Sequence, residues 1–255
     1  MTPAVKRALF FLLLLGIWEL LYQLAIKPDA LLPSPFQVVE ALKDGFFERH
    51  YLLGILVSLR RLSIGYALSI AGGVSLGILL AWSRTLEETL GTLVVALQTL
   101  PSICWLPVAI LWFGLTETAI LFVVVMGSLL AITMATKDGI RRVSPLLISA
   151  ARTMGAKGLA LHLHVTLPAA FPSIVDGMKQ GWSFAWRSLM AGELLFVIGA
   201  LGLGNHLQAG RDLNDMSQVL AVMILIVALG ILVDLLIFAA LERRIRERWG
   251  LQKDG

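Results

Sequence analysis

Long apolar runs separated by short polar segments dominate this chain. Six runs approach or exceed the roughly 20 helical residues needed to cross a hydrocarbon core, namely Ala8–Ile26, Ile64–Trp82, Leu93–Phe113, Ala119–Ala135, Ile174–Val197 and Val219–Ala240. Lipid offers an open backbone no hydrogen-bond partners, so runs of this length are predicted to be helical. The pattern therefore predicts an all-α membrane protein with about six transmembrane helices, in a single domain over residues 1–255.

The segment between the first two runs, Lys27–Ser63, is more polar. It contains the sequence Leu31-Leu32-Pro33-Ser34-Pro35 and then an amphipathic stretch, Phe36–Leu59. Such a stretch is predicted to lie along the outer membrane surface. A cytoplasmic location for it is the alternative, and would remove one span. In the second run, small residues recur every four positions, at Gly65, Ser69, Gly73 and Gly77, which predicts close packing against another helix.

Composition and charge agree with a membrane location. Of the 255 residues, 58% are hydrophobic and 15% are charged, with a mean hydropathy of +0.84, whereas soluble domains have about 25% charged residues. With the N-terminus inside, the inner segments hold thirteen of the 21 Lys and Arg residues and the outer segments hold six. Cationic residues favour the cytoplasmic side, so both termini are predicted to be cytoplasmic. The net charge of +4 thus reflects orientation, and no nucleic-acid partner is expected.

Two prolines interrupt the third run and are expected to bend it. Pro101 ends the sequence Gln98-Thr99-Leu100-Pro101, and Pro107 ends Trp105-Leu106-Pro107. Each proline removes a backbone hydrogen bond and leaves a carbonyl that needs another partner. A translocation pathway lined with water would supply one. Neighbouring helices that fill the kink are the alternative.

The fifth run is the most polar of the six. Trp182 and Trp186 are four residues apart and share a helix face, and Arg187 lies near the middle of the run. Arginine beside tryptophan can guide an anion, because guanidinium binds oxyanions through two parallel N–H groups. The alternatives are an ion pair of Arg187 with Glu193 or with another helix, or snorkelling toward water. Asp176 is three residues from a lysine, Lys179, and can pair with it along the helix.

No pattern typical of a catalytic or metal site is present. His162 and His164 are two residues apart and point to different helix faces, with no third ligand nearby. The sequence has no Gly-x-x-x-x-Gly-Lys-Ser/Thr phosphate loop, so any ATP that drives this protein is expected to bind another chain. An intramembrane enzyme would need paired acids, and Glu19, Glu193 and Asp234 lie on separate runs. Glu19 and Asp234 are interpreted as structural.

The polar segment at about residues 137–172 separates the fourth and fifth runs. A short helix is predicted over Ala150–Met154, a break at Gly155 and a second helix over Lys157–Val165, with Pro168 and Pro172 before the fifth run. A helix seated in a groove of a partner would act as a rigid lever for an external motor. An ordinary cytosolic connection is the alternative.

The spacing in this segment resembles the EAA motif of binding-protein-dependent ABC permeases. Ser149-Ala150-Ala151 is followed after three residues by Gly155 and, after nine more, by Val165-Thr166-Leu167-Pro168. Ser149 replaces the family's Glu and Val165 its Ile, and the first change removes an expected charged contact. The sequences Leu32-Pro33-Ser34-Pro35, Trp112-Phe113-Gly114 and Gly202-Leu203-Gly204, together with those around Pro101 and Pro107, resemble the nitrate/sulfonate/taurine branch.

The resemblance implies a type I ABC importer permease fold, with cytosolic coupling helices between the fourth and fifth spans. It implies a complex with two ATP-binding subunits that hold ATP and Mg²⁺, an extracytoplasmic substrate-binding protein, and a second permease subunit, expected to be a copy of this chain. No cofactor is expected in this chain itself. The coupling surface would be formed by Ser149, Ala150, Ala151, Gly155, Leu167 and Pro168.

The expected function is that of a transport subunit in the bacterial plasma membrane, and the chain is not expected to be an enzyme. The transported solute is expected to be a small anion such as a sulfonate, taurine or nitrate, moved inward by alternating access. The alternatives are a pyrimidine or flavin vitamin precursor carried by the same mechanism, or an ATP-independent secondary carrier. The predicted pathway residues are Gln98, Pro101, Trp105, Trp182, Trp186 and Arg187.

Overall fold

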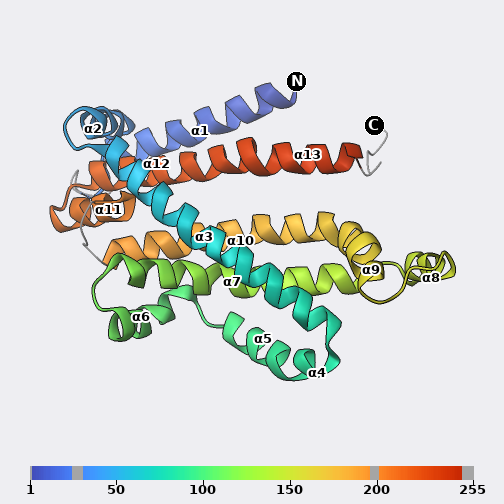
Figure 1. Ribbon diagram of the computed structural model, residues 1–255. Coiled ribbons are helices and arrows are strands. Elements are labelled where there is room, and N and C mark those ends of the chain that lie inside the picture. The colour runs from blue at the N-terminus through green and yellow to red at the C-terminus, as the bar shows by residue number, and fades with distance from the viewer. Residues whose placement is uncertain (1, 25–30, 196–200, 249–255) are drawn as a thin grey trace. The chain divides into compact units, whose positions relative to one another are not determined.

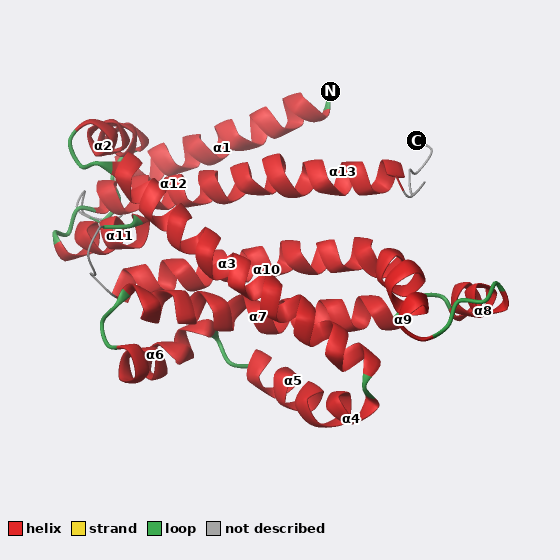
Figure 2. Cartoon of the chain, in the orientation of Figure 1, coloured by secondary structure: helices red, strands yellow, loops and turns green. Residues whose placement is uncertain are grey.

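The computed structural model describes residues 2–24, 31–195 and 201–248. The described residues form helices joined by short turns and contain no strand (Figure 2). The α-helices are α1 (Pro3–Gln23), α2 (Pro35–Phe47), α3 (Tyr51–Trp82), α4 (Arg84–Leu86), α5 (Thr92–Gln98), α6 (Leu106–Phe113), α7 (Glu117–Arg141), α8 (Pro145–Thr153), α9 (Gly158–Leu161), α10 (Leu167–Leu195), α11 (Leu203–Asp212), α12 (Met216–Val233) and α13 (Ala239–Arg248). π-Helical turns at Glu87–Gly91, His162–Thr166 and Asp234–Phe238 continue α4, α9 and α12.

Among the described residues, four helical stretches are long and apolar enough to cross a membrane, and they match the predicted second, fourth, fifth and sixth spans. They are Tyr51–Trp82, Glu117–Arg141, Gly158–Leu195 and Met216–Ile245. A fifth is the bent pair Arg84–Gln98 and Ser102–Phe113, if the pair counts as one span. The first predicted span corresponds to α1, whose 21 residues include Lys6, Arg7 and Glu19. The predicted end of this span, at Ile26, lies outside the described residues.

The predicted surface helix over Phe36–Leu59 is wrong in its extent. Helix α2 ends at Phe47, and α3 begins at Tyr51, thirteen residues before the predicted start of the second span. Ser34 begins α2 because its Oγ accepts from Gln37 N at 3.2 Å while Gln37 Oε1 accepts from Ser34 N at 2.8 Å. This reciprocal capping box fixes the start of the helix.

The third predicted span is broken once instead of bent twice. Pro101 separates α5 from a 3₁₀ turn, Ser102–Trp105, that leads into α6. The two halves meet at 104° (Figure 1). Pro107 lies in the first turn of α6, where its missing N–H would have had no helical partner, so it adds no kink.

The described chain divides into two compact units. The first contains Met1–Ser58 and Glu193–Leu229, and the second contains Leu59–Gly192 and Gly230–Gly255. In the first unit, Val38 and Ala41 of α2 pack with Ala221 of α12, and Trp18 Nε1 of α1 donates to Pro33 O at 3.0 Å.

In the second unit, the stripe of small residues on α3 packs against α7, as predicted. A Cβ at Gly65 would lie 2.8 Å from Val124, and one at Gly73 would lie 2.9 Å from Ile132. Ser128 Oγ donates to Ser69 Oγ at 2.7 Å between them. Small residues let the two backbones approach closely. Such close packing stabilises helix pairs in a membrane, where burial of apolar surface contributes little to helix association.

Candidate functional site

A hollow of about 290 Å³ lies between α5, α7 and α10 of the second unit. Its lining includes Gln98 and Pro101, at the break in the third span, and Arg187 of α10. Gly127 of α7 also lines it, and a Cβ there would overlap Ser188 Oγ, so α7 and α10 are in close contact at this level. Half of the predicted pathway residues are thus brought to one cavity by three helices.

Arg187 is exposed at this hollow and is anchored to its own helix. Its Nε donates to Ser183 O at 3.0 Å, and its guanidinium carbon lies 4.8 Å from the ring centroid of Phe184. Among the described residues, no carboxylate lies within ion-pair distance of Arg187. The predicted alternative of an internal ion pair is therefore not what the structure shows. The terminal N–H groups remain for an anion, which guanidinium binds bidentately.

A second hollow, of about 750 Å³, continues from the first along α7 and α10. The two share Gln98 and Ala131 as lining residues. The second reaches Asp138 and Arg142 at the C-terminal end of α7 and includes Gln180 of α10. The two hollows therefore adjoin at Gln98 and Ala131, along α5, α7 and α10.

The three predicted tryptophans lie outside both hollows. Trp182 and Trp186 stack with ring centroids 6.3 Å apart, which confirms that they share a face of α10. Trp182 also contacts Tyr66 and Phe238, at centroid distances of 5.4 and 6.1 Å. Trp105 contacts an aromatic ring of α7, that of Phe122. Aromatic neighbours in the second unit thus occupy these faces.

Lys179 of α10 forms ion pairs with two acids of the C-terminal helical stretch, Met216–Ile245. Its Nζ lies 3.2 Å from Asp234 Oδ1 and 3.0 Å from Glu242 Oε1. Asp234, interpreted from the sequence as a structural acid, therefore has a cationic partner, as an ionisable group at membrane depth requires.

The predicted coupling segment, about residues 137–172, contains the predicted break at Gly155. Helix α8 closes with Gly155 N donating to Arg152 O and Ala156 N donating to Ala151 O, both at 3.0 Å. Gly155 has φ of +94°. This is the Schellman arrangement, which places a residue of left-handed conformation, usually glycine, just after the helix.

Both helices beside this break differ from the predicted ones in extent. Helix α8 starts at Pro145, five residues before the predicted start. The second helix begins at Gly158 and continues through a π-helical turn into α10, so that 38 residues, Gly158–Leu195, form one unbroken stretch. Pro168 and Pro172 do not interrupt it, because Pro168 lies in the first turn after the π-helical turn, and Pro172 is accommodated within α10.

Helix α8 lies beyond the ends of α7 and α9 (Figure 1), and large apolar side chains on α8 and at its C-terminal end are exposed. Met154 is 88% exposed and Leu146 is 78% exposed. Ser149 and Ala150 are exposed, and Ala151 is buried. Exposed apolar groups on an otherwise polar loop are typical of a protein interface. Leu146 and Met154 are candidate contact residues that the motif spacing did not reveal.

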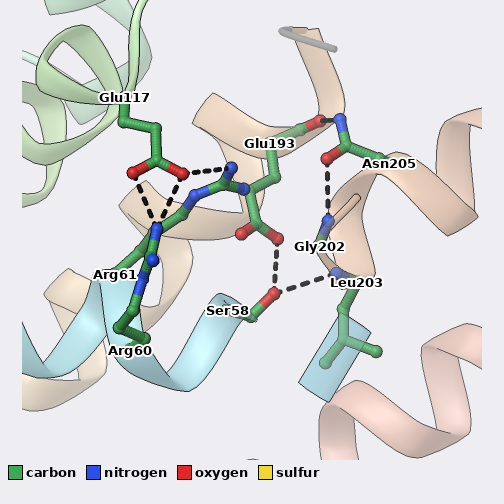
Figure 3. A network of polar contacts seen from close by, with 8 residues as sticks. All are labelled: Ser58, Arg60, Arg61, Glu117, Glu193, Gly202, Leu203 and Asn205. Carbon is green, nitrogen blue, oxygen red and sulfur yellow. Dashed lines mark hydrogen bonds and ion pairs between the residues drawn. The ribbon is translucent and has the colours of Figure 1, made fainter. Parts of the chain in front are cut away.

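A buried acid organises the start of α11 in the first unit (Figure 3). Glu193 is fully buried, and its Oε2 accepts from Ser58 Oγ at 2.7 Å and from Gly204 N at 3.1 Å. Ser58 Oγ accepts in turn from Leu203 N at 2.9 Å. A Cβ at Gly202 would overlap the carboxylate of Glu193, which explains the Gly-Leu-Gly sequence. The sequence showed this motif but did not connect it with Glu193.

The Ser58 hydroxyl should therefore contribute measurably to stability. Ser58→Ala leaves a buried carboxylate oxygen and a buried backbone N–H each short of one partner, which costs about 1–3 kcal/mol. We expect a lower melting temperature for the purified variant in detergent. Ser63→Ala, an exposed serine on the same helix, is the control. Equal melting temperatures for the two variants would contradict the assigned role.

A separate ion cluster in the second unit joins α3 to the start of α7 (Figure 3). Glu117 accepts from Arg60 Nη2 at 2.7 Å and from Arg61 Nη2 at 3.0 Å. Both arginines lie within α3, although the charge pattern placed them in an outer loop. Glu117 also lies in the first turn of α7, where the helix dipole favours an acid.

His206 of α11, in the first unit, favours its neutral form. Burial, together with the nearby His50 and Arg49, lowers the pKa of its imidazole. Its ring contacts that of Tyr51 at a centroid distance of 5.1 Å. The lowered pKa favours the neutral form of this imidazole at pH 7.

Comparison with solved structures shows the fold. An inward-facing structure of the MetNI methionine ABC transporter matches with a TM-score of 0.68 and 21% sequence identity, over 78% of this chain and 98% of that one. An amino acid ABC transporter matches with a TM-score of 0.64 and 16% identity, over 81% of this chain and 97% of that one. The fold is that of type I ABC importer permeases.

Sequence comparison shows the family. Residues 73–247 match the family described as binding-protein-dependent transport system inner membrane component. A putative ABC transporter permease of Methanocaldococcus jannaschii is 34% identical over 86% of this chain and 82% of its own length. The putative aliphatic sulfonates permease of Escherichia coli is 31% identical over 92% of this chain and 88% of its own length. The taurine permease of the same organism is 27% identical over 91% of this chain and 85% of its own length. The chain therefore belongs to the binding-protein-dependent ABC transporter permeases, among relatives of the nitrate/sulfonate/taurine branch, and is a multi-pass membrane protein.

Proposed function

We propose that this chain is the membrane subunit of an ATP-driven importer for a small anion, such as a sulfonate, taurine or nitrate. The observation that carries the anion assignment is Arg187, which is exposed at the hollow beside Gln98 and has no carboxylate partner among the described residues. Relatives described as aliphatic sulfonates, taurine and nitrate permeases support the same class.

The geometry of the hollow at Arg187 favours passage of an anion over tight binding of it. Arg187 offers a single, solvent-screened cation, so its hold on an anion is weak, and a moving solute must be able to leave. The hollow of about 290 Å³ lies at the small end of ligand sites. The shared Gln98 leads to the second hollow and toward Asp138, at the end of α7 that we assign to the cytoplasm.

The coupling segment is joined directly to this route. Gly158–Leu195 is one helical stretch of roughly 57 Å at 1.5 Å per residue, and it carries both the end of the coupling motif and Arg187. A displacement imposed on α8 and α9 by an ATPase would therefore move the helix that lines the hollow. Such rigid-body movement is what alternating access requires.

The proposed complex follows from this arrangement. Two copies of an ATP-binding subunit hold ATP and Mg²⁺ and dock at α8. A second copy of this chain completes the pathway, and an extracytoplasmic binding protein delivers the solute. Both termini lie in the cytoplasm of a bacterial cell, which the basic residues of the last helix, α13, support.

The test uses the whole complex in liposomes with its ATPase and binding protein. We would measure ATP hydrolysis with taurine, aliphatic sulfonates, nitrate, bicarbonate and a pyrimidine vitamin precursor. Stimulation by one of the anions is the expected result. Stimulation by the vitamin precursor alone would overturn the anion assignment and leave the importer standing, whereas solute uptake without any ATPase would overturn the importer itself.

A further inference from the structure

A large apolar groove on the second unit shares no lining residue with the two hollows beside α5. Its volume is about 970 Å³, and it lies between α3, α10 and α13. Ile70 and Val74 of α3 form one side, Phe171 and Met178 of α10 another, and Leu241 belongs to α13. This volume is at the upper end of the range for ligand sites, and nothing in the proposed transport route uses it.

One cation lies at this groove. Arg244 is the sole charged residue of its lining, is exposed, and has no carboxylate within ion-pair distance among the described residues. Leu241 and Arg244 are three residues apart, so they share one face of α13 with the charge one turn nearer the C-terminus. The groove therefore combines an apolar length with a cationic end.

This pattern is complementary to an amphiphile with apolar chains and an anionic head. A soluble anion would gain nothing from the apolar walls, and an uncharged lipid would not need the guanidinium. Arg binds phosphate bidentately, and basic pockets between transmembrane helices on the cytoplasmic side are typical sites for anionic lipid head groups. The position of Arg244 near the C-terminus, with Arg243 beside it, fits such a surface.

We propose that the groove binds an anionic phospholipid, with an acyl chain against Ile70, Val74 and Phe171 and the phosphate on Arg244. The proposal rests on the chain being a membrane protein and is independent of the transported solute. Leu167 and Pro168, the last residues of the coupling motif, also line the groove. A bound lipid would thus touch the segment that links α8 to the transport route, and anionic lipid content would affect coupling.

The test measures how tightly the purified full chain and its variants bind lipid in a neutral detergent. Palmitoyl-oleoyl phosphatidylglycerol is titrated, and bound lipids are counted by native mass spectrometry. Arg244→Ala should bind this lipid about fivefold more weakly than wild type, since losing one hydrogen bond of about 1 kcal/mol to the phosphate corresponds to that factor. Arg243→Ala removes an exposed neighbouring charge that does not line the groove and should bind nearly as wild type.

Two further measurements locate the site. Leu163→Trp enlarges an exposed side chain that lines the groove and should lower binding without removing a charge. A photoactivatable phosphatidylglycerol should label peptides containing Phe171, Met178 or Leu241. Equal losses for Arg244→Ala and Arg243→Ala, equally tight binding of phosphatidylcholine, or labelling elsewhere would overturn the proposal. Dimerisation that excludes lipid as protein concentration rises would show that a second copy fills the groove, and would also overturn it.

Discussion

Gly155→Pro should abolish stimulation of the ATPase by solute-loaded binding protein while the chain still inserts into the membrane. Gly155 has φ of +94° and donates its N–H to Arg152 O. Proline holds φ near −65° and has no N–H, so the end of α8 must lose the bond to Arg152 O and change its backbone conformation, at a cost of about 1–3 kcal/mol. If a cost at the upper end of this range falls on docking, the ATPase binds roughly a hundredfold more weakly.

The measurement is ATP hydrolysis by the reconstituted complex, with copurification of the ATPase as a second readout. Gly155→Asn is the matched control, because asparagine tolerates the left-handed region and keeps its N–H. No described atom lies within 4 Å of a Cβ built at Gly155, so the asparagine side chain meets no clash, although φ of +94° strains it. Gly155→Asn should therefore retain more stimulated hydrolysis than Gly155→Pro. Normal stimulated hydrolysis in Gly155→Pro would contradict the lever role of α8.

Arg187→Ala should lower the initial rate of anion uptake about tenfold or more. The substitution removes the charge at the hollow and its bidentate donors, and 1.4 kcal/mol of lost interaction already accounts for a factor of ten. Arg187 is exposed and makes no ion pair among the described residues, so folding should be little affected. Uptake of taurine, nitrate and an aliphatic sulfonate into liposomes is the measurement.

Arg187→Lys separates charge from geometry. Lysine keeps the positive charge but lacks the planar pair of donors, so an intermediate rate is expected. Affinity of the binding protein for its solute should be the same with all three permeases, because that site is on another chain. Uptake by Arg187→Ala at the wild-type rate would show that this cation does not contact the solute.

The start of the second span differs from the prediction at two charges that have a partner. Arg60 and Arg61 precede the predicted start at Ile64 and were counted among the outer charges. In the structure both arginines lie in α3 and pair with Glu117 of α7, which is far away in the sequence. A hydropathy pattern contains each charge but not the acid that pairs with it, so the pattern could not show that these arginines belong to the helix.

Local chemistry, in contrast, was predictable. The break at Gly155 needs only the conformational freedom of one residue, and the bend at Pro101 needs only a missing N–H. The family spacing from Ser149 to Pro168 is likewise a property of consecutive residues. These features depend on the chain within a few positions, so they could be predicted without knowing which helices are neighbours.

The helical class and the approximate place of the spans could be read from the chain alone, because lipid forces long apolar runs into helices. The predicted coupling segment followed from its motif spacing. Tertiary packing, in contrast, sets which polar groups meet. It brings Arg187 to the hollow that Gln98 also lines, turns Trp182 toward Tyr66, and seats Glu193 against Ser58 and Gly204. Helical periodicity defines the faces of each helix, but the partner of each face depends on packing between segments far apart in the chain.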